Sequence, residues 1–394
     1  MSKLAEKSAT GSASPSGLLT EPWFTSTEHR RRLAAVGAAL ASYDLGGVVL
    51  FQPETITWLT GYFTRAYGTF QFAVFRPGAD PVVFCRDAEI YYHQRTSAFP
   101  ERRTWGDEDD AFGRGLETIQ EIVGTGKRLG VDLTAWPLNA ARYKRLADAF
   151  GADRIVDIGS TMAKLRFIKS PAEIALMRRA GRAAEAGMAA AIATARAGIS
   201  ERELAAVICD ALVRAGSDLP GPGVLSSGEN ALHLHGSYTD RVLATGDTVQ
   251  LETLPCVRHY HARFMRPIKV GRATAEERAL VQGLVEAQDE ALALVKPGTP
   301  ARIPDAAYRD GLLRRGVVRS YARKTFYSIG LLLAPSGGEP LEAHPSADWA
   351  FEPGMTLHTY LLVQGFGMSE TIAITDSGYE RLTKFDRRLF VTEN

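Results

Sequence analysis

The stretch that decides the fold is GDTVQLETLPCVRHYHARFMRPIKVG, residues 246–271. Val249 and Leu251 alternate with Gln250 and Glu252, which is the period of two expected for a β-strand. With a turn near its middle, the stretch predicts a two-stranded hairpin. Its many charges belong either to an ordinary solvent face or to a polar cleft, and the rest of the chain decides between these readings. Its interior carries six of these ionisable residues, namely Glu252, Arg258, His259, His261, Arg263 and Arg266.

The bulk composition excludes several classes of protein. The chain has 394 residues, of which 45% are hydrophobic, so we expect two or more domains with large cores. Its 46 basic and 45 acidic residues leave a net charge of +1, which predicts no nucleic-acid or membrane partner. No long apolar run and no signal-peptide core are visible, so we expect a cytoplasmic protein. Its three cysteines form no CxxC motif and predict small buried hydrophobes.

The chain is predicted to have three parts. Residues 1–20 are rich in Ser, Gly and Ala and predict a disordered arm. Residues 21–160 alternate short apolar runs with helical patterns, which is typical of an α/β domain. Residues 161–394 form the expected catalytic domain. Its first helix should begin at the Ser170-Pro171 pair, with Ser170 as the cap and Pro171 at the first helical position.

The third part, residues 161–394, contains an internal repeat. Gly198, Leu212 and Gly216 recur 100 residues later as Gly298, Leu312 and Gly316. Each set follows a long helical pattern and precedes strand-like segments. Two such modules predict one pseudo-duplicated α+β domain, in which helices back a curved antiparallel sheet around a central cleft.

These features resemble the creatinase, aminopeptidase P and methionine aminopeptidase superfamily, whose catalytic domain has the "pita-bread" fold. The resemblance covers about residues 27–390 and implies the smaller α/β domain of creatinases and prolidases. It is carried by the junction IKSPAEI (168–174), the PG of 297–298, the hairpin, and the EPGM of 352–355.

The peptidase branch of that superfamily holds two divalent metals with two Asp, a His and two Glu. Here the matching positions carry other residues, and only the last keeps its type. A guanidinium has no acceptor for a metal, so we expect neither metal nor cofactor. The five positions are occupied by Glu252, Arg263, Ser328, Tyr360 and Glu370.

Ectoine hydrolases, a metal-free branch that opens a cyclic amidine, are the most similar group. Six pieces match in order. We therefore expect a metal-independent hydrolase of a non-peptide C–N bond in a small zwitterionic amidine such as ectoine or hydroxyectoine. The matching pieces are His235 with Thr239-Asp240-Arg241, Gly246 to Glu252, Cys256 with Tyr260-His261-Ala262, Tyr327-Ser328 with Gly330, Glu352 to His358, and Ser369-Glu370.

Two residues are the candidate catalytic groups. The ectoine hydrolase resemblance favours Glu252 as a nucleophile, whereas the creatinase resemblance favours water activated by His235 as general base. A planar cationic substrate calls for carboxylates, which Glu252 and Glu370 could supply together, and a substrate carboxylate calls for arginine. The candidate substrate-binding residues are Glu370, Arg263, His261, Tyr327, His358, Tyr360 and, as a second arginine, Arg65.

Three rival functions stay open at this point. They are a creatinase-like amidinohydrolase acting on a guanidino acid, a catalytically silent pita-bread binding module, and an Xaa-Pro metallopeptidase. The family resemblance also implies a homodimer in which the N-terminal domain of one subunit closes the active site of the other.

Overall fold

A computed structural model describes residues 19–124 and 126–392, and the chain divides into two compact units after Gly159. Residues 1–18 of the predicted disordered arm lie outside the described residues. No helix within the described ranges is long and apolar enough to cross a bilayer. Each unit has its own core and is presented by itself.

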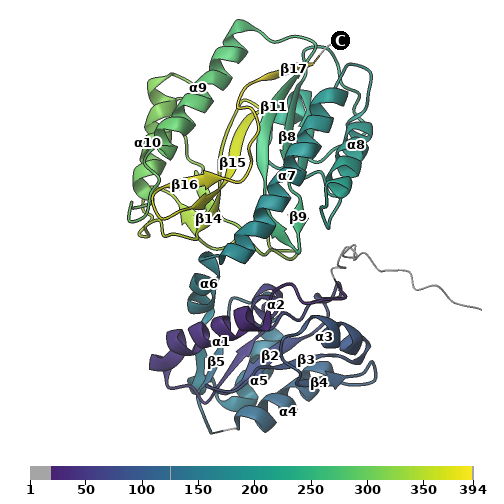
Figure 1. Cartoon of the computed structure of the whole chain (residues 1–394), viewed down its shortest axis with the longest axis vertical. Helices are drawn as coiled ribbons and strands as arrows, with labels where there is room; N and C mark the ends of the chain where they lie inside the picture. The colour runs from purple at the N-terminus through teal and green to yellow at the C-terminus, as the bar shows by residue number, and fades with distance from the viewer. Residues whose placement is uncertain (1–18, 125, 393–394) are drawn as a thin grey trace, which may run out of the picture. The chain divides into compact units, whose positions relative to one another are not determined.

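The first unit is built on a mixed six-stranded sheet in the order β4-β3-β2-β1-β5-β6 (Figure 1). The central strand β1 is fully buried and apolar, as expected for a strand covered on both faces. Stacked phenylalanines fill the core, and the rings of Phe72 and Phe84 lie 4.6 Å apart. The elements are α1 (Ser26–Leu40), β1 (Gly47–Leu50), α2 (Pro53–Thr60), β2 (Phe72–Phe75), β3 (Val82–Arg86), α3 (Ile90–Thr96), β4 (Arg102–Trp105), α4 (Ala111–Val123), β5 (Leu129–Val131), α5 (Ala140–Phe150) and β6 (Ile155–Asp157).

The second unit contains two larger sheets flanked by two helix pairs, and both sheets are antiparallel except where β17 pairs parallel with β11 (Figure 1). The unit begins within the helix α6 (Gly159–Phe167). The predicted start of α7 is confirmed, because Ser170 and Glu173 form a reciprocal capping box with Pro171 at the first position. The elements are α7 (Pro171–Thr194), α8 (Glu201–Arg214), β7 (Val224–Ser227), β8 (Thr248–Thr253), β9 (Cys256–Val257), β10 (Tyr260–His261), β11 (Phe264–Val270), α9 (Ala275–Leu292), α10 (Arg302–Arg314), β12 (Phe326–Ser328), β13 (Glu342–Ala343), β14 (Thr356–Val363), β15 (Phe366–Ile374), β16 (Tyr379–Arg381) and β17 (Phe390–Thr392).

The predicted duplication is confirmed by equivalent contacts in the two halves of this unit. Gly198 and Gly298 have φ values of 91° and 81°, a left-handed conformation that glycine adopts without strain. The amide of Gly198 donates to the carbonyl of Leu243, and the amide of Gly298 donates to that of Phe351, each at 2.9 Å. Each turn therefore lies just before a helix, α8 or α10, and is hydrogen-bonded to the segment that precedes a later strand, β8 or β14.

The hairpin of residues 246–271 forms as predicted, but its charges do not face solvent. Strands β8 and β11 pair antiparallel with Glu252 opposite Met265, and β11 is buried along its whole length. The tip makes a second small ribbon, β9 with β10, which the sequence analysis did not predict. Its turn residues Arg258 and His259 have φ values of 52° and 58°, the conformation of a tight hairpin turn.

The two large sheets meet where β11 runs beside β15. Hydroxyl groups of β15 accept hydrogen bonds from backbone amides at this seam: Met265 donates to Ser369 Oγ at 2.6 Å, and Arg263 donates to Thr371 Oγ1 at 2.9 Å. The seam brings the hairpin of the first half against the strands of the second half, and the candidate site lies there.

Candidate active site

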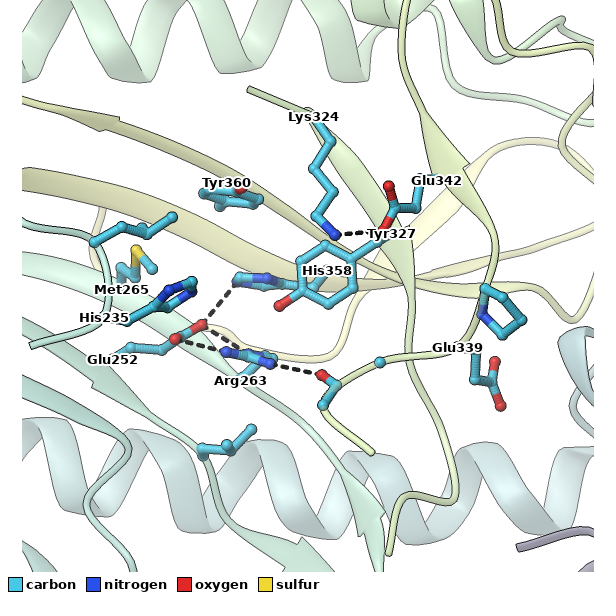
Figure 2. Close-up of a pocket in the computed structure, with 15 residues that line it drawn as sticks. His235, Glu252, Arg263, Met265, Lys324, Tyr327, Glu339, Glu342, His358 and Tyr360 are labelled. Atoms are coloured by element: carbon cyan, nitrogen blue, oxygen red, sulfur yellow. Dashed lines mark hydrogen bonds and ion pairs between the residues drawn. The ribbon is translucent and has the colours of Figure 1, made fainter. Parts of the chain in front are cut away.

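A cavity of about 560 Å³ opens in the second unit and takes its walls from both halves (Figure 2). The first half contributes residues of β8 and β11 and the segment before β8. The second half contributes β12, β14 and the segment of residues 337–342. The lining residues are Leu234, His235, Glu252, Leu254, Arg263, Met265, Lys324, Tyr327, Gly337, Gly338, Glu339, Pro340, Glu342, His358 and Tyr360.

A buried ion pair between Glu252 and Arg263 forms one wall of the cavity. Nε and Nη2 of Arg263 each donate to one oxygen of Glu252 at 2.7 Å, and the two side chains are 13% and 2% exposed respectively. Nη1 of Arg263 also donates to the carbonyl of Gly337 at 3.2 Å. Such a two-pronged pair fixes both groups in orientation as well as in charge.

The charge state of Glu252 follows from that pair. Burial by itself raises the pKa of Glu252, but the charge and hydrogen bonds of Arg263 outweigh it and lower the pKa below its ordinary value. The pKa of Arg263 moves in the opposite direction, because the attraction of Glu252 exceeds the effect of burial. Glu252 is therefore an ionised carboxylate held in a largely water-free environment.

A neutral imidazole faces this carboxylate. Nε2 of His358 lies 3.4 Å from Oε1 of Glu252, and neither ring nitrogen of His358 has a hydrogen-bond partner among the residues that the structure describes. Burial lowers the pKa of His358 to about 3, so the ring carries no charge at neutral pH. Its orientation is fixed by aromatic neighbours, with Tyr360 stacked parallel at 5.4 Å and Tyr327 edge-on at 5.1 Å.

His235 also lies next to Glu252, on the irregular segment between β7 and β8 (Figure 2). Unlike His358 it is exposed to solvent. The segment is anchored below His235 by buried Glu201, which accepts hydrogen bonds from the amide and hydroxyl of Thr239 at 2.7 and 2.8 Å. Arg241 adds a second anchor through Asp247, at 2.6 and 3.0 Å. The Thr-Asp-Arg motif thus supports the position of His235.

The structure does not place Glu370 in the cavity. In the β14–β15 register Glu370 lies opposite Thr359, which alternates with the cavity residues His358 and Tyr360, so the carboxylate faces the opposite side of the sheet. It accepts hydrogen bonds there from Arg266 at 2.6 Å and from Thr383 at 2.5 Å, all three side chains being fully buried. The expectation that Glu370 meets Glu252 across a substrate is therefore corrected.

Two further candidates also lie elsewhere. His261 is buried beside the hairpin tip, where its Nδ1–H donates to the carbonyl of His259 at 2.9 Å and burial lowers its pKa to about 4. It does not line the cavity. Arg65 is exposed on the first unit. The cavity thus brings together six candidates, namely Glu252, His235, Arg263, Tyr327, His358 and Tyr360.

The sequence analysis missed Lys324, Glu339 and Glu342. Lys324 stands three residues before the candidate Tyr327, and this short distance along the chain was the one hint available. The two glutamates belong to a Gly- and Pro-containing segment that no periodicity assigns to a cleft. Glu339 points away from the centre of the cavity and is buried against Lys169 and Ser328, whose Oγ donates to it at 2.5 Å.

Sequence comparison gives the family once this geometry is known. Residues 175–376 match the model of metallopeptidase family M24, which is more than half of the chain. The chain belongs to metallopeptidase family M24. Residues 32–168 match the creatinase/prolidase N-terminal domain, so this M24 hydrolase has the two-domain architecture predicted for it.

Curated relatives of this M24 protein match along nearly the whole chain. An uncharacterized hydrolase/peptidase of Sinorhizobium fredii is 26% identical over 94% of this chain and 99% of its own length. The ectoine hydrolase of Halomonas elongata is 26% identical over 93% of this chain and 98% of its own length.

Solved structures confirm the expected fold. The dipeptidase PepE of Mycobacterium ulcerans superposes with a TM-score of 0.81 at 24% identity, covering 94% of this chain and 99% of that one. The prolidase of Pyrococcus horikoshii gives 0.79 at 20% identity, covering 91% and 99%. At these identities the likeness concerns the fold alone.

The residues at the family's metal positions do not fit a metal pair in this M24 protein. Glu252 is bound on both oxygens by Arg263, and Glu370 is bound by Arg266. The hydroxyl of Ser328 is engaged by Glu339. Within the part of the chain that the structure describes, no group of three or more His, Cys, Asp or Glu side chains could hold a metal ion.

Proposed function

We propose that this M24 protein hydrolyses a non-peptide C–N bond in a small zwitterionic amidine of the ectoine type. The observation that carries the proposal is the Glu252–Arg263 pair: a reactive carboxylate is kept ionised by a guanidinium at a position where the peptidase branch holds metal. The full-length similarity to an ectoine hydrolase supports the substrate class. The pocket volume of about 560 Å³ suits a small molecule.

The proposed reaction adds one water across the amidine. In one route an oxygen of Glu252 attacks the amidine carbon, the C–N bond breaks, and the leaving nitrogen takes a proton, for which His235 is the candidate donor; water then releases the amide from the covalent intermediate. In the other route His235 takes a proton from water, and that water attacks the same carbon directly. In both routes the neutral His358 offers an N–H to the charge that develops near Glu252.

The two routes differ in what can be trapped. Only attack by Glu252 adds the mass of the whole ring-opened substrate to the peptide that contains this residue, because the leaving nitrogen of a cyclic amidine stays attached to the rest of the molecule. Rapid acid quenching followed by mass spectrometry of residues 246–271 therefore separates them.

The test of the function is turnover by chelator-treated protein. Ectoine, hydroxyectoine, creatine and an Xaa-Pro dipeptide are offered to the wild-type protein and to Glu252→Gln and His235→Asn, with Lys384→Met as a control at an exposed position outside the cavity. We expect amidine hydrolysis without metal, lost in the first two variants and kept in the control. A general base or nucleophile contributes about 10²- to 10⁴-fold.

Other outcomes would point to the rivals. Hydrolysis of creatine alone would favour a guanidino acid, and dipeptide cleavage only after manganese or cobalt is added would overturn the metal-independent reaction. Binding of amidines without any turnover would favour a silent binding module.

We also propose that the protein acts as a homodimer. The family resemblance suggests it, and light scattering coupled to gel filtration measures the mass directly. A monomer at micromolar concentration would refute it.

A further inference from the structure

The charged residues of the cavity differ sharply in how firmly they are already paired. Glu252 and Arg263 are 2% and 13% exposed and hold each other, while Glu339 is 3% exposed and is held by Lys169. Lys324 and Glu342 also form an ion pair, but their side chains are 36% and 44% exposed. These two are therefore the lining charges that a ligand can reach from solvent.

The energetic cost of breaking an ion pair also points to Lys324 and Glu342 as the pair that a ligand can open. Removing one partner of a buried ion pair is strongly destabilising, because a charge is left in a poorly solvated place. An exposed pair contributes little to stability, so a ligand can replace one partner at little cost. Arg263 was the expected binding group for a substrate carboxylate, but Nε and Nη2 of its guanidinium already donate hydrogen bonds to Glu252. Lys324 is the cation that is free to change partner.

The position of Lys324 is suited to a ligand that also reaches Glu252. Its ammonium lies 4.9 Å from the centre of the Tyr327 ring, a contact that holds the flexible side chain over the cavity. Figure 2 shows Lys324 and the Glu252–Arg263 pair reaching into the cavity from different walls, with His358 between them. A molecule bound against Glu252 and His358 would thus present its far end to Lys324.

We propose that Lys324 is the carboxylate anchor of this site and that Glu342 is its resting counter-ion, which the carboxylate of the ligand displaces. The inference rests on the proposed function for the location of the substrate and adds to it which residue binds the substrate carboxylate. It predicts discrimination against cyclic amidines that lack one.

The experiment is a binding measurement, so that it does not depend on turnover. Isothermal titration compares ectoine, its carboxylate-free analogue 2-methyl-1,4,5,6-tetrahydropyrimidine, and the non-amidine ring amino acid pipecolate, each on chelator-treated protein. Heats are corrected for hydrolysis by initial-rate measurement where turnover occurs. Lys324→Met removes the charge at similar length, Lys324→Arg restores it, and Lys384→Met is the matched control, since it also removes a lysine from an exposed Lys–Glu pair.

We expect Lys324→Met to weaken the binding of ectoine about 10-fold or more and to leave the carboxylate-free analogue unchanged, because a charge-assisted contact is lost only for the first. Lys324→Arg should recover most of the affinity. Glu342→Gln should strengthen ectoine binding about 2- to 5-fold, since the competitor for Lys324 is gone. Weaker binding in Glu342→Gln would overturn its role as a mere counter-ion.

The proposal fails if wild-type protein binds none of the probes, binds ectoine and its carboxylate-free analogue equally well, or loses nothing in Lys324→Met. These outcomes are separable from failure of the reaction. Lys324-dependent binding without turnover would refute the proposed hydrolysis alone, whereas turnover with an unchanged KM in Lys324→Met would refute the anchor alone.

Discussion

Replacing Arg263 by Met should destabilise the second unit strongly and in a pH-dependent way. The variant removes from buried Glu252 the guanidinium that donates to both of its oxygens, and an unpaired buried charge costs about 3–5 kcal/mol. Arg263→Lys keeps a charge but not the two-pronged geometry, and we expect a smaller loss, about 1–2 kcal/mol. The double variant Glu252→Gln/Arg263→Met removes both charges and should recover much of the stability.

The sign of the pH dependence tests the cause. In the wild-type protein the pKa of Glu252 is lowered by Arg263, so the pair stabilises the fold above the unfolded pKa of about 4.3 and this gain is lost as the pH falls through the folded pKa. Without Arg263, burial raises the pKa of Glu252 instead. The destabilisation is then largest at neutral pH and is relieved on acidification.

Hydrogen exchange followed by mass spectrometry measures this locally. Peptides covering residues 246–271 report the opening free energy of β8 and β11 separately from the first unit. A loss below about 1 kcal/mol in Arg263→Met, or a loss that does not shrink between pH 7 and pH 5, would show that the pair behaves like a surface ion pair and would refute the reasoning.

Three further outcomes are expected. Glu370→Gln should destabilise the second unit by about 3–5 kcal/mol by leaving Arg266 unpaired, while the affinity for pocket ligands in the folded fraction, measured by titration, stays within about twofold of wild type. His358→Phe should make the free energy of unfolding fall less steeply on acidification than it does in the wild-type protein. The folded pKa of His358, about 3, lies below its unfolded value near 6.5, so the unfolded state binds the extra proton as the pH falls, and wild type loses about 1.4 kcal/mol per pH unit through this group. Urea unfolding at pH 7 and pH 5 measures the difference. Thr239→Val should lower kcat more than it raises KM, because it removes the hydroxyl that bonds Glu201 beneath His235, and a KM-only change would contradict this positioning role.

The fold was predictable because its evidence is local or repeats along the chain. Alternation at Val249 and Leu251, the capping pair at Ser170, and the offset of 100 residues between glycines each reflect short-range rules that the structure obeys. Resemblance to the pita-bread superfamily then located Glu252 and Arg263 in one cleft.

The pairing of side chains was not predictable from the same evidence. That Arg263 holds Glu252, and Arg266 holds Glu370, depends on strand register and on which face of a sheet a residue occupies. A shift of one residue at the β14–β15 turn, Gln364–Gly365, would exchange the two faces, and the sequence analysis did not assign that turn. Lys324 was missed because it differs from the other charged residues of the cavity in the solvent exposure of its side chain, which depends on the folded structure.

A substrate bound at the seam between the two halves of the second unit would also stabilise the contact between these halves. Glu252 comes from one half and His358 from the other, so a molecule that contacts both clamps the halves together. Binding to the folded state alone raises the unfolding free energy by about 2.7 kcal/mol at a hundred times the Kd. A thermal-melt screen of small carboxylate-bearing amidines thus ranks candidate substrates before any reaction product is known, and it does so even for the variant in which Glu252 can no longer react.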